Sequence, residues 1–216
     1  MQERECLLGY CYTELTMSTA AAVTDAIDNL PEGNFLRPED ISDAPRTAVH
    51  MALSRAARQR SDLVRVGPGV YWKGRPSRFG PGRPDAVAIA RWRAGDRGVG
   101  PTAWLAANEL GLSTQVPAHP MLTTVGRPPK GVGGVAFAQR ANLARVDLGY
   151  LDIALLEVLR SYPDYVEVPW PQLVDHIKDL AERGAIQLDA VAQAAANERS
   201  APLKANLHRL LASLRA

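Results

Sequence analysis

Two acidic residues in the C-terminal half have the spacing of a metal-binding pair. Asp164 and Glu167 are three positions apart, and paired carboxylates at such a separation can hold a magnesium ion in nucleases. The lysine expected beyond the second acid of such a nuclease is absent, because Pro169 stands there. Two acids without the remaining catalytic groups favour an acidic loop ahead of a helix at Trp170.

Other catalytic or ligand-binding patterns are missing from the sequence. The four histidines are scattered, and no Cys or His pair has the spacing of metal ligands. No glycine-rich segment ends in the Gly-Lys-Ser/Thr of a phosphate loop, so Gly131 to Gly134 is interpreted as a turn within a hairpin. We therefore expect no enzyme activity, no catalytic residues, no metal and no cofactor.

A different chemistry is present on the segment from Asp43 to Arg60, which is predicted to be a helix with Asp43 as its cap and Pro45 in its first turn. Its apolar residues share one face, and its hydroxyl and arginine side chains share the other. Such side chains can hydrogen-bond to base edges in the major groove of DNA. The expected base-reading residues are Thr47, Ser54, Arg55 and Arg58.

A β-hairpin is expected directly after this helix. The β-prone runs Leu63–Val66 and Val70–Lys73 flank Pro68 and Gly69, which suit the central positions of a type II turn. Cations of the helix and hairpin would bind the DNA phosphates. These expected phosphate contacts are Arg46, Arg65, Lys73 and Arg75.

The charge distribution favours a polyanionic partner for the front of the chain only. The chain has 216 residues and a formal net charge of +2. Eleven Lys and Arg lie between Arg46 and Arg93 against two acids, whereas ten acids face seven bases from Asp147 onward. An ordinary arginine-rich surface would give the same count, so the charge asymmetry indicates nucleic acid only in combination with the helix.

These residues would be positioned by a winged helix-turn-helix over residues 18–74. A helix from Thr19 to Leu30 is capped by Ser18 or Thr19, a short helix begins at Pro38, and the longer helix and hairpin follow. That order is typical of winged helix domains. A small helical subdomain with a purely structural hairpin is the alternative.

The rest of the chain is expected to form a tail, a linker and a second domain. Residues 1–17 lack periodicity, which makes Met17 a candidate start, and residues 75–84 form a basic Gly/Pro linker. In 85–216, helices are predicted at 85–94, 102–110, 148–160, 170–183, 189–197 and 203–215, with strands at 121–125 and 132–138 around a Pro-Pro-Lys-Gly turn. The predicted fold class is α+β, with a mixed α/β C-terminal domain that ends in helices.

Cysteine usage and hydropathy favour the cytoplasm. The two cysteines, Cys6 and Cys11, both lie in the tail and cannot form a disulfide framework for the body of the protein. No apolar run approaches the roughly 20 residues of a membrane span. We therefore expect a cytoplasmic protein without a membrane partner.

Three segments together resemble the AbiEi family of antitoxins, in particular its short DUF6088-type branch. They are Phe35–Ile41, the hairpin Leu63–Tyr71 and the segment Ala106–Pro117, and the resemblance covers roughly residues 18–139. By its residues alone, the third segment is a helix, a glycine cap and an extended exit. Its Asn108 and Gln115 could bind a partner or pin the backbone.

The resemblance implies a DNA-binding transcriptional autorepressor that is also the antitoxin of a nucleotidyltransferase toxin. The N-terminal domain would then bind duplex DNA, and residues 85–216 would form the antitoxin-like domain. A homodimer on an inverted repeat in the promoter would match the symmetry of such operators. The alternatives are a winged-helix regulator without a toxin partner, a protein-interaction scaffold, and a magnesium-dependent nuclease that uses Asp164 and Glu167.

Overall fold

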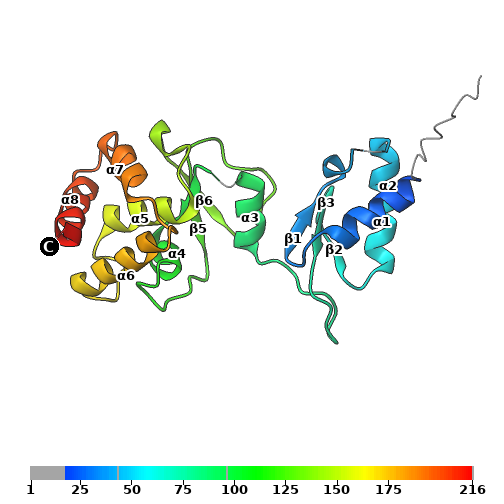
Figure 1. Cartoon of the computed structure of the whole chain (residues 1–216), viewed down its shortest axis with the longest axis horizontal. Coiled ribbons are helices and arrows are strands. Elements are labelled where there is room, and N and C mark those ends of the chain that lie inside the picture. Colours follow the sequence, from blue (N-terminus) through cyan, green and yellow to red (C-terminus); the bar gives the residue numbers. More distant parts are fainter. Residues whose placement is uncertain (1–17, 43, 96, 216) are drawn as a thin grey trace, which may run out of the picture. The chain divides into compact units, whose positions relative to one another are not determined.

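The computed structural model describes residues 18–42, 44–95 and 97–215. The predictions about the tail and Asp43 therefore lie outside the described residues. Contacts divide the chain into two compact units, one that ends at Pro84 and one that begins at Asp85. Each unit combines helices with a small three-stranded sheet, so the fold is a mixed α and β one (Figure 1).

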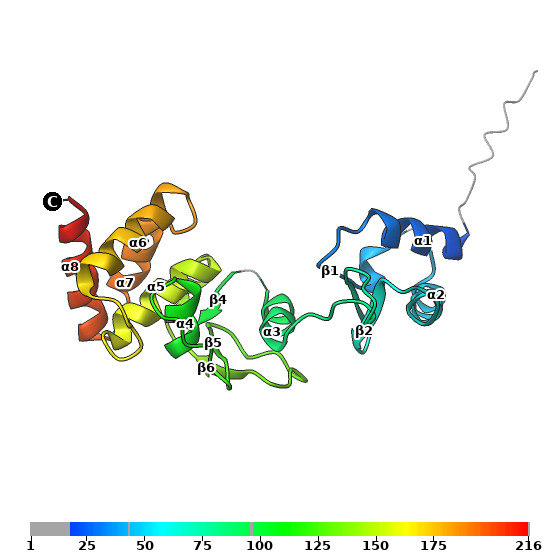
Figure 2. The same ribbon diagram turned by 90° about the horizontal axis from the view of Figure 1, so that it is seen from below.

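The N-terminal unit packs two helices on one face of a sheet (Figures 1 and 2). Its elements are α1 (Thr19–Asn29), β1 (Asn34–Leu36), a 3-10 turn η1 (Pro38–Asp40), α2 (Arg46–Gln59), β2 (Leu63–Gly67) and β3 (Val70–Lys73). The antiparallel sheet has the order β1-β3-β2. The predicted helices and hairpin are confirmed as elements.

Helix caps and a turn glycine determine where these elements begin and end. One cap differs from the prediction. Ser18 caps α1, because its hydroxyl accepts a hydrogen bond of 3.2 Å from the Ala21 amide. At α2, Pro45 occupies the cap position rather than the first turn, and it offers no side-chain hydrogen bond. Gly69 has a φ of +65°, the left-handed conformation that the predicted turn requires of its second central residue.

The C-terminal unit is built around a buried helix. Its elements are α3 (Ala86–Ala94), β4 (Val99–Pro101), α4 (Ala103–Glu109), β5 (Met121–Thr124), β6 (Ala136–Gln139), η2 (Leu143–Arg145), α5 (Tyr150–Ser161), α6 (Trp170–Glu182), α7 (Leu188–Ala196) and α8 (Ala201–Arg215). Helix α5 packs against α4, α7, α8 and β4, and it is buried along nearly its whole length. Helix α3 lies beside the sheet, on the other side from α5 to α8 (Figures 1 and 2).

The sheet of this unit corrects one prediction. Strands β5 and β6 are parallel, with Met121 opposite Ala136, so residues 131–134 are not the turn of a hairpin. The chain after β5 instead runs back to the start of that strand before it forms β6. Strand β4, which pairs antiparallel with β5, was not predicted, since Gly100 and Pro101 are depleted in strands.

Close packing explains the glycine in β4. A Cβ atom on Gly100 would lie 2.5 Å from the Cβ of Ile153 on α5. Only glycine therefore lets this strand approach the central helix so closely. No helix in the described part of the chain is long and apolar enough to cross a membrane.

Candidate nucleic-acid interface

Helix α2 has the two faces that its sequence predicts. Val49 and Leu53 are fully buried in the core of the N-terminal unit, whereas Thr47, Arg55 and Arg58 are exposed. The apolar face of α2 packs against α1 and β2. The polar face is therefore left free for a partner.

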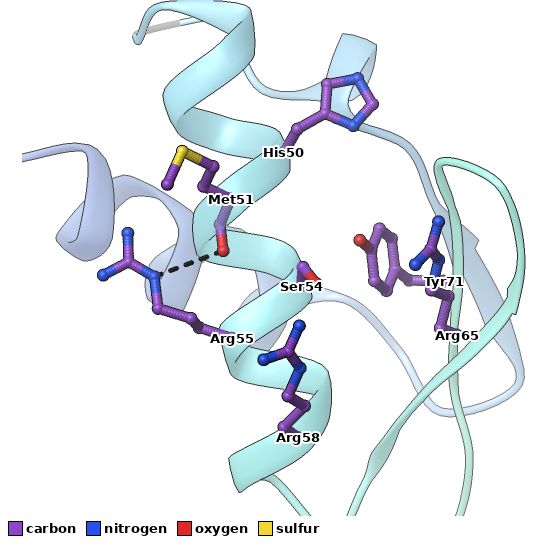
Figure 3. Close-up of a pocket in the computed structure, with 7 residues that line it drawn as sticks. All are labelled: His50, Met51, Ser54, Arg55, Arg58, Arg65 and Tyr71. Carbon is purple, nitrogen blue, oxygen red and sulfur yellow. Dashed lines mark hydrogen bonds between the residues drawn. The ribbon is translucent and has the colours of Figure 1, made fainter.

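A surface depression of about 400 Å³ lies between this polar face and the β2–β3 hairpin (Figure 3). Five of its residues come from successive turns of α2, one comes from β2 and one from β3. The residues that line it are His50, Met51, Ser54, Arg55, Arg58, Arg65 and Tyr71. We call this set the α2–hairpin groove.

The groove contains three arginines and no acid. The Arg55 Nε donates a hydrogen bond of 3.4 Å to the Met51 carbonyl, and the Arg65 Nε donates one of 3.3 Å to the Gly67 carbonyl. Arg58 forms no ion pair with any residue that the structure describes. Three guanidinium groups without carboxylate partners among the described residues give this groove a positive potential suited to an anion.

Three other arginines of the unit are paired with acids. Arg46 forms an ion pair with Glu39, and Arg60 pairs with Asp28 at 2.8 Å and with Asp62. The hydrogen bond from Arg60 lowers the pKa of Asp62 below its ordinary value, and this outweighs the effect of partial burial. Arg75 lies 3.1 Å from Glu32. These three arginines are therefore partly neutralised by acids, unlike those that line the α2–hairpin groove.

Lys73 has a structural role instead of the expected one. Its ammonium group donates hydrogen bonds of 2.7 and 3.0 Å to the carbonyls of Ile27 and Asp28, near the C-terminal end of α1. A cation in this position satisfies carbonyls that have no partner within the helix. The expectation that Lys73 binds phosphate is revised accordingly.

The sequence-predicted residues are therefore only partly brought together. Ser54, Arg55, Arg58 and Arg65 line the groove, whereas Thr47, Arg46 and Arg75 are exposed outside it. Sequence reasoning did not assign Tyr71 to the site. That assignment depends on the strand register, which places Arg65 opposite Tyr71.

The hairpin turn lies close to α2 at one end of the groove. A Cβ atom on Gly69 would lie 3.4 Å from the Cε1 of His50, which is tighter than most such contacts. The turn therefore lies beside His50 of α2, with little room for a side chain at position 69. His50 also escaped the sequence prediction, because its position on the helix flank gives no signal until the turn is placed.

The predicted linker folds back on the N-terminal unit. The Gly82 amide donates a hydrogen bond of 3.1 Å to the Arg75 carbonyl, and the Trp72 indole donates one of 3.1 Å to the Gly82 carbonyl. Phe79 is 85% exposed, and the Arg78 guanidinium lies 4.6 Å from its ring centroid. Residues 74–82 thus form a closed loop that belongs to this unit.

In the acidic pair of the C-terminal unit, Glu167 holds the backbone of the 106–117 segment. The Glu167 carboxylate accepts hydrogen bonds from the Thr114 amide at 2.7 Å and from the Gln115 side chain at 3.1 Å. These bonds lower the pKa of Glu167, the bond from the Thr114 amide most of all. Among the described residues, no three His, Cys, Asp or Glu side chains are grouped so that they could hold a metal ion.

The same contacts answer the question left open for the 106–117 segment. The Asn108 side chain donates a hydrogen bond of 3.1 Å to the Ser113 carbonyl, and Gln115 binds Glu167. Asn108 therefore pins the backbone directly, and Gln115 binds the carboxylate that holds the Thr114 amide.

Comparison with known proteins gives a distant structural likeness. The chain matches no family model and no curated protein sequence. Among solved structures, it is similar to the Rv2827c protein from Mycobacterium tuberculosis, with a TM-score of 0.45 and 16% sequence identity over 91% of this chain and 80% of that one. The function is therefore inferred from the site itself.

Proposed function

We propose that the N-terminal unit is a winged helix-turn-helix that binds duplex DNA, with α2 in the major groove. The observation that carries this proposal is the α2–hairpin groove, where Arg55, Arg58 and Arg65 lie together without an acid. An α-helix fits the major groove, and arginine is the side chain that most often contacts guanine there. Proteins that bind DNA neutralise its phosphates with such cations.

The positions of the side chains suggest separate roles. Ser54, Arg55 and Arg58 lie on α2 and would face the base edges, whereas Arg65 on β2 would bind a phosphate. Thr47, in the first turn of α2, would contact DNA where the helix enters the groove. Arg46 and Arg75 are exposed but paired with acids, so each would have to exchange its carboxylate for a phosphate.

The family resemblance extends this proposal to a biological role. A protein of the AbiEi type would repress its own operon by occupying the promoter, as a dimer on an inverted repeat, in the cytoplasm. Residues 85–216 would counteract a nucleotidyltransferase toxin. A winged-helix regulator without a toxin partner is the alternative, and the N-terminal geometry supports both equally.

A salt-dependent binding assay tests the DNA-binding proposal. The full-length protein is titrated into labelled DNA from upstream of its own gene, and into a shuffled duplex, at several salt concentrations. We expect tighter binding to the upstream DNA and a steep loss of affinity with salt, because phosphate contacts release counterions. Arg65→Ala should weaken binding to both duplexes and flatten the salt dependence, while the matched variant Arg183→Ala, at the residue that caps the C-terminus of α6, should leave both unchanged.

Salt-insensitive or absent binding to both duplexes would overturn the proposal. The antitoxin role needs a second assay, in which the chain is co-expressed with the product of the neighbouring gene. Rescue of growth would support an antitoxin. Operator binding without rescue would favour the regulator that has no toxin partner.

A further inference from the structure

The C-terminal unit contains a buried ionic cluster that the proposed function does not use. Its centre is Arg145, whose side chain is only 1% exposed. The Arg145 Nη1 lies 2.6 Å from the Glu157 Oε1, and its Nε lies 2.6 Å from the Glu198 Oε1. Each glutamate also binds a second arginine, Arg140 at Glu157 and Arg160 at Glu198. We call these five residues the arginine cluster.

The charges of the arginine cluster do not cancel. Burial raises the pKa of Glu157, but the hydrogen bonds from Arg140 and Arg145 outweigh this and lower it to about 2. The pKa of Glu198 is also lowered, so both glutamates are ionised at neutral pH. Three guanidinium groups thus share two carboxylates, which leaves an excess of one positive charge. Such a charge in a poorly solvated place is costly unless an anion or water compensates it.

Hydrogen-bond donors are left over as well. The Arg145 Nη2 and the Arg160 Nε are buried and have no hydrogen-bond partner among the described residues. Buried polar atoms are nearly always satisfied in folded proteins, so such exceptions call for an explanation. Here they coincide with the excess charge.

A depression of about 650 Å³ lies at the surface of the arginine cluster. Arg140 and Arg160 line it, and Glu157 and Glu198 hold them in place. Arg199 also lines it, and this side chain has no ion pair with any described residue. Leu143, at 75% exposure, adds an apolar side chain to the lining. The volume lies within the usual range of small-ligand sites.

We propose that this depression binds a small ligand that carries a phosphate group. A phosphate group has a charge of −1.5 to −2 near neutral pH and several strong acceptor oxygens. Arginine binds phosphate through paired N–H groups, and Arg140 and Arg160 are held by their glutamates before any ligand arrives. Glu198 also lines the depression, but its carboxylate is engaged by Arg145, Arg160 and Asn142. Leu143 would pack against an apolar part of the ligand, such as a nucleoside.

Calorimetric titration of the full-length protein at constant ionic strength tests this site. The probes are inorganic phosphate, AMP and a short single-stranded oligonucleotide with a 5′-phosphate. We expect saturable binding of at least one probe. Arg199→Glu should weaken it by about tenfold or more, because a charge-assisted hydrogen bond is replaced by repulsion. Arg199→Gln keeps a polar side chain of similar size and should give a smaller loss, which separates charge from a folding defect.

Two matched controls locate the binding. Arg127→Glu changes an exposed arginine of the same unit that does not line the depression, and it should bind as the wild type does. Arg58→Glu changes the α2–hairpin groove and should leave the phosphate and AMP titrations unchanged. Arg199-dependent binding of AMP assigns the site to free nucleotides, whereas Arg199-dependent binding of the oligonucleotide alone assigns it to nucleic-acid ends. The proposal is overturned if no probe binds saturably, or if Arg199→Glu binds every probe as the wild type does.

Discussion

At the scale of single residues, the arginines of this protein divide by their partners rather than by their position in the sequence. Arg60 and Arg58 are two positions apart on or beside α2, yet Arg60 is paired with two aspartates while Arg58 faces the groove. An arginine with acidic partners is largely neutralised and contributes little to a distant anion. The arginines that have no acidic partner among the described residues determine where an anion would bind.

Arg58 is expected to contribute to sequence discrimination. Arg58→Ala should reduce the preference for upstream over shuffled DNA by about 1–3 kcal/mol, the usual range for a lost bidentate base contact. Competition binding at one fixed salt concentration measures this preference. The companion variant Arg65→Ala should keep the preference while it weakens both complexes. An equal loss on both duplexes for Arg58→Ala would remove this residue from the base-reading face.

Glu157 is expected to dominate the acid stability of the C-terminal unit. Its pKa in the folded protein is about 2, below the ordinary value of 4.5. Because the folded pKa is the lower one, this carboxylate stabilises the fold above pH 4.5, and that contribution is lost as the pH falls toward 2. Glu157→Gln should lower stability at pH 7 by about 3–5 kcal/mol, since Arg145 would keep a buried charge with one partner fewer.

Chemical unfolding of the full-length protein between pH 7 and pH 2 checks this expectation. The variant should show a shallower loss of stability with acid than the wild type. The exposed Glu182 on α6 provides the control Glu182→Gln, which should match the wild type at every pH. If the unfolding free energies of Glu157→Gln and the wild type fell in parallel with pH, this would contradict the assignment of the acid sensitivity to Glu157.

At the scale of elements, the N-terminal unit depends on a contact between strand β3 and helix α1. Lys73 at the end of β3 binds the last carbonyls of α1, and Trp72 holds the 74–82 loop through Gly82. Strand β3 also pairs with both other strands of the sheet. This strand therefore organises the unit, while α2 and β2 present the groove.

Lys73 and Arg65 should separate stability from DNA binding. Lys73→Met should cost about 1–2 kcal/mol of stability, because a cation at the C-terminal end of a helix is lost. Its effect on DNA affinity should be small. Arg65→Met should do the reverse, with a stability change within about 0.5 kcal/mol and a clear loss of affinity. Thermal unfolding and DNA titration of both variants give the comparison, and a loss of affinity alone for Lys73→Met would restore it as a phosphate contact.

At the scale of the whole molecule, the chain consists of two units that each have a core. Buried residues of the N-terminal unit form one cluster, and those of the C-terminal unit form two others. The boundary falls between Pro84 and Asp85 because the 74–82 loop closes on the first unit. A division of labour between the units is thus physically feasible.

The two units should therefore be separable. A fragment of residues 18–84 should fold and bind the upstream DNA, and one of residues 85–216 should fold without binding it. A fragment that stops at Gly80 should melt at a lower temperature than the 18–84 fragment, since it loses the Gly82 contacts to Arg75 and Trp72. Circular dichroism melts and DNA titration measure both effects. DNA binding by the 85–216 fragment alone would contradict the assignment of the groove.

The sequence by itself determined the local features of this protein. The periodicity of apolar residues located the helices, and Pro68 with Gly69 located the hairpin turn, because these signals depend on neighbours within a few positions. Ser54, Arg55 and Arg58 followed from the helical repeat alone. The opposite faces of α2 could be assigned for the same reason.

Only the tertiary structure decided which distant residues meet. The pairing of β5 with β6 is parallel, Lys73 reaches a helix more than forty residues earlier, and Arg145 lies between Glu157 and Glu198. No sequence pattern links the two sides of any of these contacts, because each contact depends on how separate elements pack. Which arginines remain free for an anion is therefore a property of the fold and not of the sequence motif.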